Sequence, residues 1–114
     1  MRVVALVTDL MDQSRIRAAL DDVVFVRSVD DVLARSDLDT VDSLIVDLRR
    51  CADVATDIGA LRASAPEAYI VGFGPHVDDA TLAAGRSGGA DVVLPRSRFF
   101  RDVRNMGLRP ATGE

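Results

Sequence analysis

Five short runs of branched apolar residues recur along the chain, and they limit the possible folds more than any other feature of the sequence. Most of the runs are continuously apolar rather than alternating, and the gaps between them are each long enough for a crossover helix. Both properties are typical of a parallel sheet covered by helices on its two faces. The runs predicted to be strands are residues 2–7, 23–26, 43–46, 69–73 and 91–94.

Helix start and stop signals lie between and after these runs. Ser28 is followed three residues later by an acidic residue, a spacing similar to that of a capping box. Asp78 is a good N-cap for a fourth helix, which Gly88 and Gly89 would end. Ser97 is expected to cap a short fifth helix. A helix is therefore predicted after each predicted strand.

Strict alternation of strand and helix, five times over without a linker or an internal repeat, determines the expected fold class. We expect an α/β domain of the flavodoxin-like (βα)5 kind, a doubly wound sandwich whose parallel five-stranded sheet has the strand order 2-1-3-4-5. The domain is expected to span residues 1–106, and residues 107–114 are expected to form a flexible C-terminal tail.

The composition excludes several classes of protein. A single cysteine cannot form an internal disulfide, and together with a single histidine it provides no ligand set for structural zinc. No apolar run approaches the roughly 20 residues of a membrane span, and no signal peptide precedes the first predicted strand. We therefore expect a cytoplasmic protein that does not bind membranes. No glycine-rich phosphate loop is present, so no nucleotide cofactor or small-molecule substrate is expected.

The charge of the chain is unevenly distributed. All 14 basic residues are arginines: nine stand against sixteen acids in residues 1–95, and five against two acids in residues 96–114. Three interpretations of the basic end remain open: contact with an acidic partner, contact with a phosphate-rich surface, or a solvated helix face. The net charge of −4 and the lack of a second domain argue against nucleic-acid binding.

Two acidic residues follow predicted strands that should be neighbours in the sheet. Asp9 comes after the first strand and Asp47 after the third, so the two carboxylates are expected to converge at the carboxyl edge of the sheet. Paired carboxylates can hold Mg²⁺, which shields an incoming phosphoryl group while one carboxylate attacks it. Asp9 and Asp47 are therefore candidate metal ligands, and Asp47 is the candidate phosphoryl acceptor.

Three segments resemble parts of the receiver domain of two-component response regulators. Residues 7–9 (Val-Thr-Asp) resemble its acid-pair segment, residues 44–48 (Leu-Ile-Val-Asp-Leu) its phospho-acceptor strand, and residues 89–95 (Gly-Ala-Asp-Val-Val-Leu-Pro) its segment ending in lysine-proline. The resemblance covers roughly residues 2–104. It implies a non-enzymatic module of signal transduction.

A narrower resemblance concerns short, stand-alone receiver-like proteins of bacteria. It depends on residues 72–78 (Gly-Phe-Gly-Pro-His-Val-Asp), together with the Gly-Ala-Asp and Leu-Pro-Arg-Ser stretches that follow later in the chain. The resemblance supports the fold more than any activity. By position, the switch and loop region that it implies contains Gly72, Gly74, His76, Pro95 and Arg96.

Four parts of the receiver pattern are changed. Thr8 stands where the family has a second acid, Leu94 where it has lysine, and Val92 where it has an aromatic switch residue. The hydroxyl expected after the fourth strand is replaced by the Gly-Phe-Gly of residues 72–74. Only weak binding of Mg²⁺ is therefore expected, with impaired or absent phosphorylation of Asp47.

Alternatives to these site assignments remain open. Asp47 could instead be an ordinary strand-end carboxylate that interacts with Arg49 or Arg50. Asp9 could cap a helix that begins near residue 12 or 13. His76 could act as a base or simply shape its loop. A phosphorylatable, atypical response regulator and a small anion-binding protein or enzyme using His76 are accordingly kept as alternative functions.

The resemblance also implies a surface for protein contact. In the family, the fourth helix, fifth strand and fifth helix form the usual meeting surface. In this chain that surface would carry Arg86, Arg98, Phe99 and Arg101, although the helical spacing of Phe99 with Val103 also fits packing in the core. We therefore expect a homodimer or a protein partner, possibly an acidic one, and a function carried out by protein contact.

Overall fold

The sheet has the predicted topology. In the computed structural model, which describes residues 2–75 and 78–106, five parallel strands lie in the order β2-β1-β3-β4-β5. This confirms the (βα)5 flavodoxin-like fold and the strand order expected from the sequence. Each strand lies within one residue of its predicted bounds. The strands are β1 (Val3–Leu6), β2 (Val23–Val26), β3 (Ser43–Asp47), β4 (Tyr69–Gly74) and β5 (Val92–Pro95).

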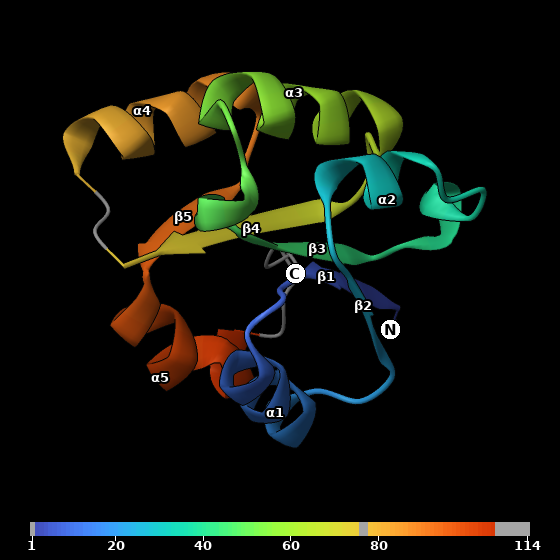
Figure 1. Ribbon diagram of the computed structural model, residues 1–114, viewed down its shortest axis with the longest axis vertical. Coiled ribbons are helices and arrows are strands. Elements are labelled where there is room, and N and C mark those ends of the chain that lie inside the picture. Colours follow the sequence, from blue (N-terminus) through green and yellow to red (C-terminus); the bar gives the residue numbers. More distant parts are fainter. Residues whose placement is uncertain (1, 76–77, 107–114) are drawn as a thin grey trace.

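Helices cover the sheet on both faces. Figure 1 shows α2, α3 and α4 on one face and α1 and α5 on the other, so the chain forms three layers. The helices are α1 (Leu10–Ala19), α2 (Val29–Leu33), α3 (Val54–Ser64), α4 (Asp79–Gly88) and α5 (Arg96–Met106), and the short 3-10 turns η1 (Leu38–Thr40) and η2 (Leu48–Arg50) flank β3. Among the described residues, no helix has both the length and the apolar character needed to cross a bilayer.

Two hydrophobic cores form because successive side chains of a strand point to opposite faces of the sheet. Within β1, Val4 and Leu6 pack into the core beneath α2, α3 and α4, whereas Val3 and Ala5 pack into the core beneath α1 and α5. All four side chains are buried. The central strands are therefore apolar on both faces, which explains why their sequences do not alternate.

Aromatic side chains form the centre of the core between β4 and α5. The Phe73 and Phe99 rings stack with their centroids 4.6 Å apart, and Phe100 meets both rings edge-on at 5.4 Å and 5.0 Å. Phe99 is fully buried, so the expectation that it lies on a contact surface is wrong. Burying its ring against the sheet contributes about 1.5–3 kcal/mol of hydrophobic stabilisation.

The predicted helix caps are mostly confirmed. The Ser28 hydroxyl accepts a hydrogen bond from the Asp31 N–H, and the Asp78 carboxylate accepts one from the Thr81 N–H. Gly89 ends α4 with a φ of +112°, a left-handed conformation that glycine adopts without steric cost. The expected cap at Ser97 is wrong, because α5 already begins at Arg96, directly after β5.

Candidate functional site

The loops at the carboxyl ends of the strands bring several predicted site residues to one edge of the sheet. Asp47 ends β3, Pro95 ends β5, and Arg96 begins α5. Asp9 lies between β1 and α1. The predicted switch residue His76 and the predicted tail at 107–114 lie outside the described residues.

A guanidinium group covers the carboxylate of Asp47. Arg49 Nε donates to both carboxylate oxygens of Asp47, at 3.1 Å and 3.2 Å, and Arg49 Nη2 donates to Oδ2 at 2.7 Å. The backbone N–H of Arg49 adds a fourth hydrogen bond, at 3.0 Å to Oδ1. Asp47 is 1% exposed. Its lone pairs are therefore engaged by one residue, and the hydrogen bond that Arg49 donates to Asp47 raises the pKa of Arg49.

A second buried carboxylate, Asp12, lies beside this pair. Asp12 is completely buried on the first turns of α1, and the two terminal nitrogens of the Arg96 guanidinium, Nη1 and Nη2, donate to its two oxygens. Arg49 Nη2 also lies 3.5 Å from Asp12 Oδ2. The hydrogen bond to Asp12 raises the pKa of Arg96. We call the four residues Asp12, Asp47, Arg49 and Arg96 the edge cluster; its two acids and two arginines balance in charge.

Asp9 has a different role from the one expected of a metal ligand. Its exposed carboxylate accepts the Asp12 N–H at 3.0 Å and so caps α1, which confirms the capping alternative. The helix begins at Leu10, two to three residues earlier than expected. The pKa of Asp9 is lowered, first by the hydrogen bond from the Asp12 N–H and further by the positive charges of Arg96 and Arg49.

The edge cluster does not fit a magnesium ion. Within residues 2–75 and 78–106, no three His, Cys, Asp or Glu side chains come close enough together to hold a metal. Asp47 accepts hydrogen bonds from Arg49 on both oxygens, and Asp9 accepts one at the start of α1. A divalent cation would also have to replace or tolerate a neighbouring guanidinium, which opposes its binding electrostatically. The predicted pair Asp9 and Asp47 therefore lies at one edge, where hydrogen bonds from Arg49 and from the start of α1 occupy oxygens that a metal ion would need.

The predicted switch residues of β4 are packed rather than free. A Cβ on Gly72 would lie 3.0 Å from the Leu48 Cδ2 atom, so the lack of a side chain lets η2 fold tightly against β4. Gly74 is buried at the end of the same strand, whereas Pro95 is exposed at the end of β5. Leu94, at the family's lysine position, packs partly buried against the aromatic core.

Sequence reasoning missed the central role of Asp12. A signal was available, because helix geometry places residue 12 one turn after the cap at residue 9, and thus near the sheet edge. That Arg96 would pair with Asp12, 84 residues away, had no local signature. The pairing of Asp47 with Arg49 was among the alternatives, and the structure confirms it.

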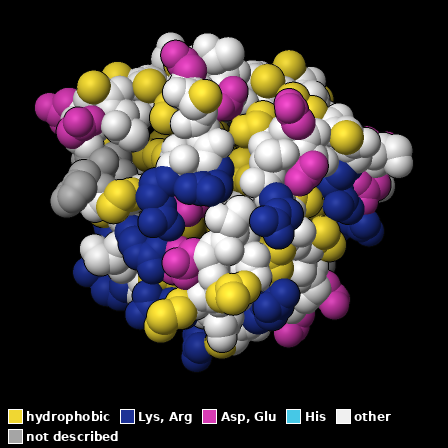
Figure 2. All heavy atoms as spheres, in the orientation of Figure 1, with side chains coloured by type: hydrophobic (Ala, Val, Ile, Leu, Met, Phe, Trp, Pro, Cys, Tyr) yellow, Lys and Arg dark blue, Asp and Glu magenta, His cyan; other side chains and the backbone are white. Residues whose placement is uncertain are grey.

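The basic side chains gather at this end of the molecule. Figure 2 shows them clustered near η2 and the start of α5, with acidic side chains between them. Of the predicted contact residues, Arg86, Arg98 and Arg101 are exposed. Arg86 and Arg98 line a hollow of about 420 Å³ between α4, β5 and α5, which Leu82, Val92 and Leu94 also line.

Comparisons with known proteins identify the fold. No protein-family model and no curated protein sequence matches the chain. A response regulator from Hahella chejuensis superposes with a TM-score of 0.76 at 22% identity, covering 90% of this chain and 88% of that one. A response regulator from Thermotoga maritima gives 0.74 at 14% identity, with 90% of each chain covered. The beryllofluoride-activated NtrC4 receiver domain dimer gives 0.74 at 14% identity, covering 90% and 93%. The chain thus has the fold of response regulator receiver domains.

Proposed function

Starting from the receiver fold, we propose that this chain is a receiver-like signalling module that works by protein contact and does not accept a phosphoryl group on Asp47. The observation that carries the proposal is the edge cluster, in which Arg49 engages both oxygens of Asp47. In the receiver pattern, the equivalent carboxylate must be free to attack phosphorus. Here it is a buried partner of a guanidinium.

The chemistry of phosphoryl transfer supports this proposal. The transferring group spreads negative charge over three oxygens, and catalysis depends on cations and donors that are already in position. Thr8 and Leu94 replace an acid and a lysine of the receiver pattern, and Gly72-Phe73-Gly74 contains no hydroxyl. If each lost contact costs about 1.5–3 kcal/mol, three losses slow transfer by roughly three orders of magnitude or more.

One observation favours the alternative of an atypical, phosphorylatable regulator. Asp47 ends the strand whose sequence resembles the phospho-acceptor strand, and the Arg49 side chain that covers it is 41% exposed. An exposed arginine can swing into solvent at a modest energetic cost. The alternative therefore depends on how firmly Arg49 holds Asp47.

Intact-mass measurement after incubation with acetyl phosphate and Mg²⁺ separates the two possibilities. The parent protein and Asp47→Ala should both remain unmodified, because the acceptor in the parent is blocked. Arg49→Ala uncovers Asp47 and serves as the informative variant: a phosphate-sized adduct in this variant alone would identify Arg49 as the block. An adduct that accumulates in the parent and disappears in Asp47→Ala would overturn the proposal.

Protein contact is proposed to use the surface formed by α4, β5 and α5. Its hollow combines apolar side chains such as Leu82 with the exposed arginines Arg86 and Arg98, a mixture suited to a polar-rimmed interface. The NtrC4 receiver domain, which shares this fold, was solved as a dimer. A second copy of the chain or an acidic protein is the partner that this surface favours.

A further inference from the structure

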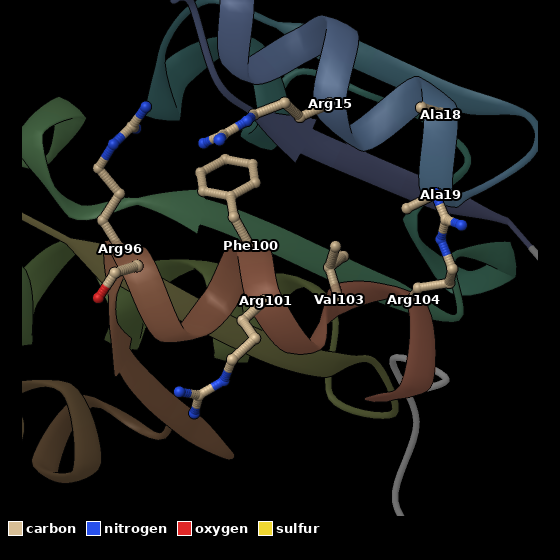
Figure 3. A pocket seen from close by; sticks show the side chains of 9 residues that line it. Arg15, Ala18, Ala19, Arg96, Phe100, Arg101, Val103 and Arg104 are labelled. Carbon is tan, nitrogen blue, oxygen red and sulfur yellow. The ribbon is translucent and has the colours of Figure 1, made fainter.

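A groove between α1 and α5 lies apart from the proposed contact surface. It has a volume of about 690 Å³, and its lining includes Arg15, Ala18 and Ala19 from α1 together with Phe100, Val103 and Arg104 from α5. Figure 3 shows Arg15 above the ring of Phe100 and Arg104 reaching toward Ala19, so the two guanidiniums come from opposite helices. The small side chains of the two alanines keep the groove open.

Among the described residues, two of the four arginines that line this groove have no acidic partner. No Asp or Glu is among the residues that line it. Within the described part of the chain, neither Arg15 nor Arg104 forms an ion pair, whereas Arg96 at the end of the groove is bound to Asp12. Arg101 has Asp102 at 3.2 Å, and its guanidinium points away from α1 (Figure 3). The available positive charge is therefore that of Arg15 and Arg104.

Arg15 is held in place by an aromatic ring rather than by an anion. Its guanidinium carbon lies 5.1 Å from the centroid of Phe100, and that of Arg96 lies 5.0 Å from the same centroid. Stacking of this kind orients a guanidinium while its N–H groups stay free to donate at the edge. Phe100 thus fixes the direction of Arg15 without using its hydrogen-bonding capacity.

We propose that the groove binds a small phosphorylated molecule that also has an apolar portion. Arginine forks match phosphate oxygens in a bidentate geometry, and Arg15 and Arg104 each offer one such fork from opposite helices of the groove. The apolar floor formed by Phe100, Val103 and the two alanines would contact the rest of the ligand. The volume falls within the range of roughly 300–1,000 Å³ typical of ligand sites.

A small molecule suits this groove better than an acidic peptide. Arg15 and Arg104 lie on either side of a short apolar floor instead of continuing along an extended track (Figure 3). The inference differs from the expectation that the chain has no nucleotide cofactor and no small-molecule substrate. It is also independent of the proposed function, since no ion pair or side-chain hydrogen bond of the described residues joins Arg15 or Arg104 to Asp47.

Calorimetric titration of the full chain with ATP, sodium triphosphate and adenosine, in buffer without Mg²⁺, tests the proposal. ATP should bind, triphosphate should bind more weakly, and adenosine should bind weakest. Arg15→Ala/Arg104→Ala should weaken ATP binding by about tenfold or more, because it removes two charge-assisted donors. The matched control is Arg27→Ala/Arg86→Ala, which removes the same charge from two exposed arginines outside the groove and should change binding less than about twofold.

Two further measurements locate the site and guard against misfolding. With ¹³C-methyl alanine, ATP should shift the Ala18 and Ala19 methyl resonances of the parent protein, and this readout needs no variant. Arg15→Lys/Arg104→Lys keeps the charge but removes both forks, so its affinity for ATP should fall between those of the parent and the alanine variant.

Three results would overturn the proposal. The first is no binding of ATP or triphosphate at millimolar concentration. The second is an equal loss of affinity in the groove variant and in its control, which would mean diffuse attraction to a basic surface. The third is tighter binding of a hexaglutamate peptide than of ATP, which would assign the groove to an acidic protein segment. Each result leaves the acetyl phosphate experiment on Asp47 unaffected.

Discussion

The arginines of the edge cluster and the arginines on the outer surface of α5 have different surroundings. Arg49 and Arg96 each contact a carboxylate that is almost completely buried. Arg98 and Arg101 share one half-exposed neighbour, Asp102, at 3.7 Å and 3.2 Å, and their own side chains are 60% and 70% exposed. The residue type is the same in both regions, but only in the edge cluster does the arginine compensate a buried charge.

This difference predicts which arginines matter for stability and which are free to contact a partner. A buried carboxylate that loses its partner keeps the full cost of its desolvation, whereas an exposed ion pair contributes little because water and salt replace it. The edge cluster should therefore contribute to stability and should not be available to ligands. The α5 surface should contribute almost nothing to stability and should be available to partners.

The largest predicted effect is that of Arg96→Ala on stability. The variant leaves Asp12 completely buried without its bidentate partner, and the free energy of unfolding should fall by about 2–4 kcal/mol, toward the lower side because Arg96 itself is partly exposed. Urea unfolding measures this loss. Arg86→Ala, at an exposed arginine of α4 that has no carboxylate contact among the described residues, is the matched control and should stay within about 0.5 kcal/mol of the parent.

A second substitution shows whether charge burial is the cause. Asp12→Asn in the Arg96→Ala background should restore part of the lost stability, because the buried group then carries no charge. If Arg96→Ala is no more destabilising than Arg86→Ala, the contrast between the two groups of arginines is incorrect.

A smaller effect on stability is predicted for Asp9, the N-cap of α1. Its pKa is lowered in the folded protein, so its charge stabilises the fold above the ordinary value of 3.8, and this stabilisation is lost as the pH falls through the lower folded pKa. Asp9→Ala should therefore lower the melting temperature at pH 7 by more than at pH 3. Asp9→Asn keeps an N-capping oxygen without the charge, so its melting temperature at pH 7 should lie between those of the parent and Asp9→Ala.

Thermal unfolding followed by circular dichroism at the two pH values measures this difference. A melting-temperature loss in Asp9→Ala that is the same at pH 7 and at pH 3 would show that the charge of the cap does not matter. The stabilisation by the Asp9 cap would then come entirely from the geometry of its hydrogen bond.

The fold could be predicted from the sequence because its signals are local. Runs such as Ser43–Asp47 are short, apolar and β-branched, and the caps at Ser28 and Asp78 act within three residues of their targets. Parallel pairing and strand order then follow from chain length and the handedness of crossovers. The error at Ser97 concerns a helix boundary, where β5 passes directly into α5 without a loop.

The site could be predicted only in part because its contacts are long-range. The position of Asp47 at the sheet edge and its pairing with Arg49, two residues away, follow from the neighbouring sequence. The pairing of Asp12 with Arg96 depends on how α1 and α5 pack against one face of the sheet, and no sequence pattern specifies which arginine reaches a given acid. Phe99 was named as a contact residue only because the resemblance places α5 in a meeting surface; its helical spacing with Val103 already favoured the core, where the structure places both residues.

The smallest effect on stability is predicted for the outer surface of α5, where contact with a partner should change instead. Arg98→Glu/Arg101→Glu should alter the free energy of unfolding by less than about 1 kcal/mol, because both side chains are mostly exposed and each pair with Asp102 is weak. The same variant should change self-association, or capture of an acidic partner, in a salt-dependent way, since reversed charge repels what arginine attracts. Sedimentation velocity at low and at high salt measures self-association, and pull-down with the purified parent and variant measures capture. Arg27→Glu/Arg50→Glu, two exposed arginines away from α5, controls for net charge and should leave both properties close to those of the parent. If the α5 variant and this control behave alike at both salt concentrations, the exposed arginines of α5 are a solvated helix face, and the proposed contact surface has to depend on the apolar hollow beside β5 alone.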